Sequence, residues 1–431
     1  MDINWLQLCY ALVGGLGMFI YGMKLMSDGL QKSAGNSLKM ILEKLTSNRV
    51  IGAFVGLVVT AIIQSSSATT VMVVGFVNAG LMNLMQALSV VLGANIGTTI
   101  TAQIIAFKVS QFALPAIGIG VVMRLFIKGK KTQSMGEILL GFGFLFLGME
   151  IMTKGFAPLN HNAAFKDAFV MFSSNPLLAV AAGAILTMVV QSSSATIGIT
   201  IALATIGVID YMAASALVLG ENIGTTITAN LAAIGTNKAA RRAALGHFLF
   251  NLIGVSYMVL FLPGLMQLVD AFTPGAANMI AADGTRPNLA RHIANVHTTF
   301  NIINTLIFLP ILPYLARLCE KIIKGDDTPD SFKLIYLKEV LVETPTIAVV
   351  QAIKEVKRMS DSALAMLKLS KDAFFERNLD KINKIYELEE SVDLLQKKFP
   401  TSLLNSLKKI LRKRRRKPLT GFFMRSMISK K

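Results

Sequence analysis

Charged residues are scarce in this chain of 431 residues: they make up 16% of it, while hydrophobic residues make up 53%. A soluble domain usually has about a quarter of its residues charged, so the composition excludes an ordinary soluble enzyme. The mean hydropathy of +0.58 instead indicates a protein that crosses a membrane several times.

Cysteine and histidine are also rare. The two cysteines, Cys9 and Cys319, lie near opposite ends of the hydrophobic region, which excludes a disulfide scaffold and a thiolate metal cluster. The four histidines lack the spacing of a metal site, since His292 and His297 are five residues apart rather than four. We therefore expect no cofactor and no transition metal.

Acidic residues are absent from the end of the chain. The segment from Lys397 onward has 13 Lys and Arg and no Asp or Glu, so it accounts for 13 of the 18 net positive charges and leaves 5 for the rest. The high net charge therefore does not indicate a nucleic-acid partner. Most of this charge lies in a basic tail, residues 399–431, which is either a solvated segment or one attracted to anionic lipid headgroups.

Seven apolar runs predict full membrane crossings, at about 20 residues each. They are Leu6–Met26, Leu84–Phe107, Phe112–Phe126, Gly136–Met152, Met212–Ile234, Ala243–Leu262 and Ile293–Leu318. The first run has no preceding Lys or Arg, so we interpret it as a retained helix rather than a signal peptide. Two further stretches, Val50–Gly80 and Pro176–Val208, are interrupted midway by a polar block. Each is too short for two crossings and predicts a re-entrant hairpin of two half-length helices.

Loop charges predict the orientation in the membrane. With the N-terminus outside, the inside loops carry twelve Lys and Arg and the outside loops carry five. Positive charges favour the cytoplasmic side. We therefore expect a multi-pass protein of the cell membrane, with its N-terminus outside and its C-terminus in the cytoplasm.

A duplication is the most informative pattern. The sequence TAIIQSSSAT at Thr60–Thr69 returns as TMVVQSSSAT at Thr187–Thr196, and LGANIGTTITA at Leu92–Ala102 returns as LGENIGTTITA at Leu219–Ala229, both 127 residues later. An earlier pair, Gly15–Gly29 and Gly141–Gly155, is offset by 126. Each repeat has three crossings, an odd number, so the second copy enters the membrane upside down. Inverted repeats are typical of secondary transporters.

The two polar blocks predict an anion site. Buried amides and hydroxyls cost several kcal/mol in hydrocarbon unless they are satisfied, and the block Gln-Ser-Ser-Ser occurs twice. The second half-helix of each hairpin, beginning near Ala68 and Ala195, presents free N–H groups and its positive dipole end. Two such ends facing each other match the several oxygens of phosphate. Serines that only bond to helix carbonyls and allow close packing are the alternative.

Lys and Arg are absent from these blocks, and sodium can supply the missing positive charge. Hard oxygen ligands for an ion are available in the blocks Asn95–Thr99 and Asn222–Thr226, where Asn-x-Gly-Thr-Thr can unwind a helix and expose its carbonyls. A glycine-mediated helix contact is the alternative. The repeats differ at the position just before these blocks, where Ala94 is replaced by Glu221, and an intramembrane Glu is a functional candidate.

These paired motifs resemble the type II sodium-dependent phosphate cotransporter family over about residues 14–318. The resemblance implies sodium-coupled symport of phosphate, with no enzyme activity. It implies phosphate contacts from Ser65, Ser66, Ser67, Ser192, Ser193 and Ser194. It implies sodium ligands among Gln64, Gln191, Asn222, Thr225, Thr226 and Thr228, to which the first copy of the second block adds Asn95, Thr98 and Thr99. The implied fold is an all-α polytopic membrane protein with two inverted-topology repeats, each with a re-entrant helical hairpin, and a short cytoplasmic helical region.

The cytoplasmic end resembles the start of a PhoU-like helical domain, from Leu341 to about Lys398, and suggests a regulatory partner. The predicted organisation is repeat 1 over 1–132, repeat 2 over 133–262, an external loop and final crossing over 263–324, the PhoU-like segment over 325–398 and the basic tail over 399–431. Two other functions stay open: a passive anion channel or phosphate sensor, and an intramembrane serine hydrolase. The hydrolase needs a base, and His247 is the one histidine in the middle of a predicted span.

Overall fold

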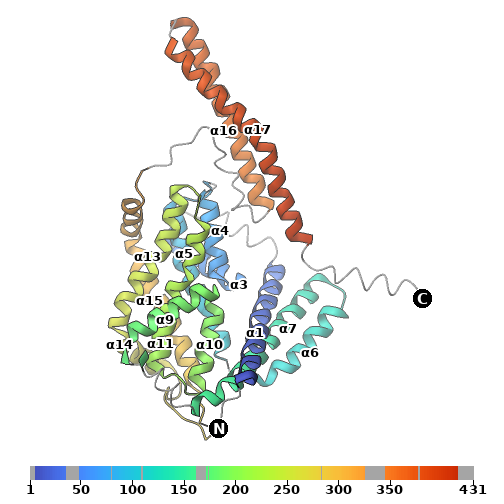
Figure 1. The fold of residues 1–431 in the computed structure, drawn as a ribbon, viewed down its shortest axis with the longest axis vertical. Helices are drawn as coiled ribbons and strands as arrows, with labels where there is room; N and C mark the ends of the chain where they lie inside the picture. The colour runs from blue at the N-terminus through green and yellow to red at the C-terminus, as the bar shows by residue number, and fades with distance from the viewer. Residues whose placement is uncertain are drawn as a thin grey trace, which may run out of the picture. The chain divides into compact units, whose positions relative to one another are not determined.

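The computed structural model describes residues 5–34, 48–78, 80–107, 110–161, 171–172, 174–282, 284–325, 345–376 and 379–415. All regular structure in these ranges is helical, so the predicted all-α class is confirmed (Figure 1). The chain divides into two compact units. One comprises Met1–Val74, Asn83–Ala233 and Arg242–Ile323, and the other comprises Gly75–Met82, Ile234–Arg241 and Lys324–Lys431.

Five helices of the described chain are long and apolar enough to cross a membrane. They are α1 (Trp5–Ala34), α5 (Leu84–Ile105), α7 (Lys130–Phe156), α13 (Lys238–Leu260) and α15 (Leu289–Ile322). The other two predicted crossings are shorter. One is the 3-10 turn η1 (Ser110–Phe112) followed by α6 (Ala113–Leu125), and the other is split into α11 (Tyr211–Thr225) and α12 (Ile227–Ala232).

The two interrupted stretches each form a pair of half-length helices, as their length predicted. The first pair is α3 (Arg49–Ile63) and α4 (Ser66–Asn78), and the second is α9 (Pro176–Val190) and α10 (Ser193–Thr205). The Thr60 and Thr69 Oγ1 atoms lie 3.0 Å apart. This hydrogen bond places the helices of the first pair side by side next to their turn.

The duplication is visible in the helix boundaries. Helices α3, α4 and α5 begin at residues 49, 66 and 84, and α9, α10 and α11 begin at 176, 193 and 211, each 127 residues later. The N-caps repeat too: Asn48 and Asn175 cap the first helix of each pair, and Asn83 and Asp210 cap α5 and α11. Matched caps and boundaries show that both copies fold alike locally.

Helices α1 and α7, the first of each repeat, pack side by side through glycines (Figure 1). A Cβ atom placed on Gly22 would lie 2.6 Å from the Gly141 oxygen, and one on Gly15 would lie 2.9 Å from the Gly148 oxygen. From one contact to the next, the residue number increases along α1 and decreases along α7, so the two helices are antiparallel. The missing side chains allow the two backbones to approach closely.

Two further helix contacts hold the half-length helices in place. A Cβ atom on Gly93 would lie 1.7 Å from the Ala53 oxygen, so α5 packs directly on α3. The matching contact joins Gly220 of α11 to Val180 of α9, where the distance would be 2.0 Å. Helix α15 packs against α5, α10 and α11. The segment between α13 and α15 contains α14 (Leu262–Phe272), within the region predicted to begin an external loop.

The second unit contains two long helices that lie side by side, α16 (Pro345–Glu376) and α17 (Leu379–Arg415). Helix α17 runs through residues 398 and 399 without a break, so the structure has no element boundary where the sequence predicted the basic tail to begin. The beginning of the predicted PhoU-like segment, at 326–344, and the end of the basic tail, at 416–431, lie outside the described residues.

Candidate functional site

The two Gln-Ser-Ser-Ser blocks form the turns between the half-length helices. At each turn the glutamine adopts left-handed backbone angles, with φ of 57° at Gln64 and 55° at Gln191. These are the only non-glycine residues with positive φ in the described part of the chain. Such a conformation costs about 1–2 kcal/mol for a residue with a Cβ. Its occurrence in both copies indicates that the glutamine side chain is needed there.

The first serine of each block caps the helix that follows. Ser65 Oγ accepts a hydrogen bond of 3.1 Å from the Ala68 N–H, and Ser192 Oγ accepts one of 3.2 Å from the Ala195 N–H. Side-chain oxygens at this position satisfy one of the N–H groups that every helix start leaves open. Each hydroxyl accepts in the cap and keeps its O–H proton free to donate, so Ser65 and Ser192 remain predicted phosphate contacts.

The other four serines have hydroxyl groups that make no hydrogen bond with the described residues: Ser66, Ser67, Ser193 and Ser194. They lie in the first turn of α4 and of α10, where N–H groups have no intrahelical partner. Ser66 and Ser194 are buried, with 3% and 8% of their surface exposed. Each turn therefore presents hydroxyls, N–H groups and the positive end of a 13-residue helix.

One cavity brings the two turns together. It has a volume of about 240 Å³ and is lined by all eight Gln and Ser residues of the two blocks and by Ile63. Residues that are 127 apart in sequence thus share one small space. All the serines predicted to contact phosphate line it, as do both glutamines.

Helix α1 forms the remaining wall of this cavity and contributes its only basic residue. Ile20, Met23, Lys24 and Ser27 line it, and Ser27 Oγ donates a 2.5 Å hydrogen bond to the Ile63 oxygen at the first turn. Lys24 makes no hydrogen bond or ion pair with the described residues. Sequence reasoning missed Lys24, although it lies inside the duplicated block Gly15–Gly29. The reason is that a lysine near the end of a predicted span usually extends to the lipid headgroups and anchors the helix there.

The two glutamines differ in their side-chain contacts. Gln64 Nε2 donates to the Ala61 oxygen, and Gln64 Oε1 accepts a 2.9 Å hydrogen bond from Thr101 Oγ1. The side chain of Gln191 has no such partner in the described chain, and the counterpart of Thr101, Thr228, donates to the Thr225 oxygen instead. The first turn is therefore tied to α5, while the second keeps its amide available.

The sodium ligands predicted in and next to the two Asn-x-Gly-Thr-Thr blocks do not line this cavity. Most of them are buried, and each bonds to a backbone oxygen three or four residues earlier: Asn95 to Val91, Thr98 to Ala94, Thr99 to Ile96, Asn222 to Val218, Thr225 to Glu221, Thr226 to Ile223 and Thr228 to Thr225. Helix α5 continues through its copy of the block, so the expected unwinding does not occur there. The second copy is interrupted at Thr226, between α11 and α12. The glycines of the block pack on the half-length helices, with Gly97 against Thr60 and Gly224 against Thr187.

A buried polar network joins the second copy to α15. Asn222 Oδ1 accepts a 3.2 Å hydrogen bond from Asn301 Nδ2 and lies 3.3 Å from His297 Nε2. Beside it, Glu221 Oε1 accepts a 2.9 Å hydrogen bond from Thr200, while Glu221 Oε2 has no partner. Sequence reasoning singled out Glu221 but not α15, because α15 has no counterpart in the duplicated motifs.

The hydrolase alternative finds no support in the cavity. His247 is fully buried and neither ring nitrogen has a partner, but it is not among the lining residues. Lys24 lines the cavity without a hydrogen bond to any serine. The described residues also contain no group of three or more His, Cys, Asp or Glu that could hold a metal ion.

The duplicated turns and their shared cavity agree with the comparison to known families. Residues 18–154 and 148–272 both match the Na+/Pi-cotransporter family. The chain belongs to this family. Residues 356–426 match the PhoU domain, which extends past residue 398, where we expected the resemblance to end.

Individual relatives of this family are moderately similar to the chain. YjbB of Salmonella typhimurium, whose name gives it a candidate role in inorganic phosphate export, is 29% identical over 83% of this chain and 63% of its own length. YqeW of Bacillus subtilis, an uncharacterized protein, is 30% identical over 71% of this chain and 95% of its own. The rat sodium-dependent phosphate transport protein 2A is 34% identical over 22% of this chain and 15% of its own.

The chain therefore spans less than two thirds of the length of YjbB. No solved structure matches it. The relatives are transporters by name or uncharacterized, which agrees with the expectation that this protein is not an enzyme.

Proposed function

We propose that this protein is a symporter that moves inorganic phosphate across the cell membrane together with sodium. The observation that carries the proposal is the single cavity lined by both Gln-Ser-Ser-Ser turns. Two helix N-termini and four unpartnered serine hydroxyls converge there. This density of hydrogen-bond donors suits an anion with several oxygens.

Charge balance supports sodium coupling. Phosphate enters as a mono- or dianion, and burying an uncompensated ion costs several kcal/mol. Lys24 supplies one positive charge, which leaves a dianion one charge short. We assign sodium to the oxygen-rich region behind the turns, with Gln191, Asn222, Thr225 and Thr226 as the main ligands. The names of relatives that include sodium-dependent phosphate transport are consistent with this assignment.

The repeats support an inverted architecture and alternating access. Helices α1 and α7 hold matching positions in the two copies and pack antiparallel, which is what an axis in the membrane plane requires. We propose that α3–α4 and α9–α10 are re-entrant hairpins that meet near the midplane. With the N-terminus outside and the C-terminal unit in the cytoplasm, the PhoU-like helices are placed to contact a regulatory partner.

The deciding experiment measures transport in vesicles that contain the purified protein. Radioactive phosphate should accumulate when a sodium gradient points inward and should fail to accumulate when choline replaces sodium. Equal phosphate fluxes with sodium and with choline, across a range of pH, would instead favour a passive anion channel. Binding without flux would favour a phosphate sensor.

A further inference from the structure

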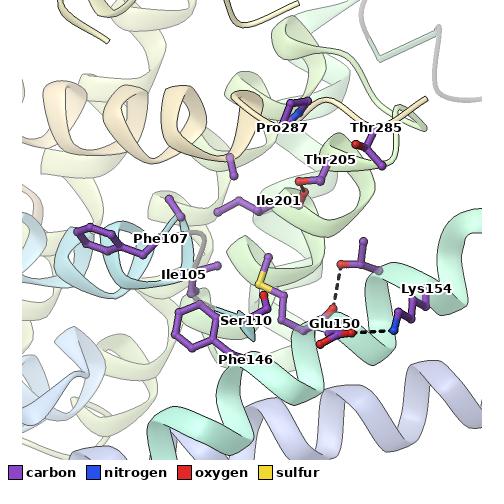
Figure 2. Close-up of a pocket in the computed structure, with 14 residues that line it drawn as sticks. Ile105, Phe107, Ser110, Phe146, Glu150, Lys154, Ile201, Thr205, Thr285 and Pro287 are labelled. Atoms are coloured by element: carbon purple, nitrogen blue, oxygen red, sulfur yellow. Dashed lines mark hydrogen bonds and ion pairs between the residues drawn. The ribbon is translucent and has the colours of Figure 1, made fainter. Parts of the chain in front are cut away.

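The part of α1 that lines the phosphate cavity has a counterpart on α7 that lines a different cavity. The four residues of α1 are Ile20, Met23, Lys24 and Ser27. Their counterparts, each 126 residues later, are Phe146, Met149, Glu150 and Thr153. All four of these counterparts line a second cavity of about 320 Å³, shown in Figure 2.

This second cavity includes neither serine turn. Its other walls come from the end of α5 and the residues after it, from the end of α10, and from the segment that leads into α15 (Figure 2). They include Ile105, Phe107, Ser110, Ile201, Thr205, Thr285, Pro287 and Ala290. The hydroxyl groups at corresponding positions of α1 and α7 also make different contacts. Ser27 bonds to the first turn at the Ile63 oxygen, whereas Thr153 Oγ1 donates a 2.8 Å hydrogen bond to Met149 of its own helix.

The two repeats are thus alike in sequence but differ in which helix contacts the turns. An antiparallel pair of related helices has two equivalent arrangements, with either α1 or α7 against the turns. The structure contains the arrangement with α1. Exchanging the repeats generates the other arrangement, in which Thr153 would approach Val190, the counterpart of Ile63.

The counterpart positions carry opposite charges. Lys24 corresponds to Glu150, and Asp28 corresponds to Lys154. In the present arrangement Glu150 Oε1 forms a 2.7 Å ion pair with Lys154 Nζ (Figure 2). Both residues line the second cavity, which no residue of either turn lines. Both positions lie toward the C-terminal ends of their helices, so Lys24 and Glu150 lie toward opposite faces of the membrane.

We propose that α1 and α7 exchange places at the turns during transport, so that Lys24 lines the phosphate site in one state and Glu150 lines it in the other. This inference rests on the proposed function and adds two side chains to its site. Lys24 attracts phosphate in the state that opens toward the C-terminal end of α1. Glu150 repels it in the state that opens toward the C-terminal end of α7. The protein therefore binds phosphate more tightly from the first face than from the second.

The test measures phosphate exchange in vesicles in which the protein has one orientation, with the phosphate concentration varied at one face and saturating at the other. Lys24→Met should raise the half-saturating concentration at least tenfold at the face where α1 ends and less than twofold at the opposite face. Glu150→Gln should lower it severalfold at the face where α7 ends. Lys131→Met removes an exposed lysine that lines neither cavity and should change neither value.

Two further variants keep the test decisive. Lys24→Arg retains the charge and should retain the low half-saturating phosphate concentration. The double variant Lys24→Glu and Glu150→Lys should reverse which face binds phosphate more tightly. In a background without Cys9 and Cys319, the pair Ser27→Cys and Ile63→Cys should crosslink the state described here. The pair Thr153→Cys and Val190→Cys should crosslink the other.

The outcomes separate this inference from the proposed function. If wild-type protein exchanges phosphate but Lys24→Met changes both faces equally, or neither, the exchange of α1 and α7 is wrong while the transport function stands. Failure of the Thr153–Val190 crosslink under conditions where wild-type protein turns over would also overturn it. Absence of phosphate exchange by well-folded wild-type protein would overturn the proposed function itself.

Discussion

At the scale of single residues, the two turn glutamines combine an unfavourable backbone with unequal side-chain contacts. A glycine at this position has no steric cost for left-handed backbone angles, but it loses more conformational entropy on folding. The net effect is a free energy of unfolding higher by about 0.5–1 kcal/mol. Gln191→Gly should therefore stabilise the fold. Gln64→Gly also loses the hydrogen bond to Thr101, worth about 1 kcal/mol, and should show no gain. Thermal unfolding of the purified variants compares them, and a more stable Gln64→Gly than Gln191→Gly would contradict this account.

The second and third serines of each block line the cavity and have no structural role as helix caps, so they test phosphate binding separately from stability. The double change Ser66→Ala and Ser193→Ala should abolish phosphate transport and leave the melting temperature nearly unchanged. Each lost hydrogen bond to an anion is worth about 1.5–3 kcal/mol. Ser65→Ala with Ser192→Ala removes two caps instead and should lower stability by about 1 kcal/mol for each cap. Normal transport by the folded first variant would refute the phosphate assignment.

Thr225 tests the sodium assignment. Thr225→Val keeps the shape of the side chain and removes the oxygen, which donates to Glu221 of its own helix. The sodium concentration for half-maximal phosphate transport should rise severalfold, with little change in expression. Ser256→Ala removes a hydroxyl that also bonds to its own helix, at Leu252, but lies on α13. It should behave as wild type, and an unchanged sodium requirement in Thr225→Val would remove Thr225 from the site.

At the scale of helices, the contact between α1 and α7 depends on the absence of side chains. A Cβ atom on Gly22 would lie 2.4 Å from the Leu145 nitrogen, whereas one on Gly17 of the same helix would meet nothing within 4 Å. Gly22→Ala should therefore destabilise the protein by several kcal/mol or prevent folding. Gly17→Ala should be tolerated. Denaturation of both variants in detergent measures the difference, and equal stability would mean that the two helices do not pack as described.

The sequence predicted the half-length helices because their determinants are local. A polar block inside a stretch of about 30 apolar residues ends one helix, and a serine starts the next. The Asn-x-Gly-Thr-Thr blocks were harder to interpret, because the same residues suit an unwound segment and a close helix contact. The structure has the contact at Gly97, where threonines bond to their own helix and leave α5 continuous.

At the scale of the whole molecule, the orientation in the membrane is the main untested prediction. Lys128→Cys, between α6 and α7, should be protected from an impermeant thiol reagent in intact cells. Met279→Cys, between α14 and α15, should be labelled. Both positions are exposed, and both variants need a background without Cys9 and Cys319. Labelling of Lys128→Cys but not Met279→Cys would invert the topology.

The assembly of the site was only partly predictable. The duplicated blocks identified both turns and all the serines, because identical motifs at one offset indicate equivalent roles. They did not identify Lys24, since its counterpart is Glu150 and the pair differs in charge. Which of two related helices faces a shared cavity depends on the conformational state, and no local pattern in the sequence encodes that choice.

The glycine contact between α1 and α7 also has a consequence for ancestry. Gly15 meets Gly148, the counterpart of Gly22, and Gly22 meets Gly141, the counterpart of Gly15. Two copies of one unit make this reciprocal contact around a twofold axis. An ancestor with a single unit could therefore have built the same helix pair from two separate molecules inserted in opposite directions. Two identical molecules cannot place a lysine on one side and a glutamate on the other. Joining the units in one chain is what allows the two faces of the membrane to be treated differently.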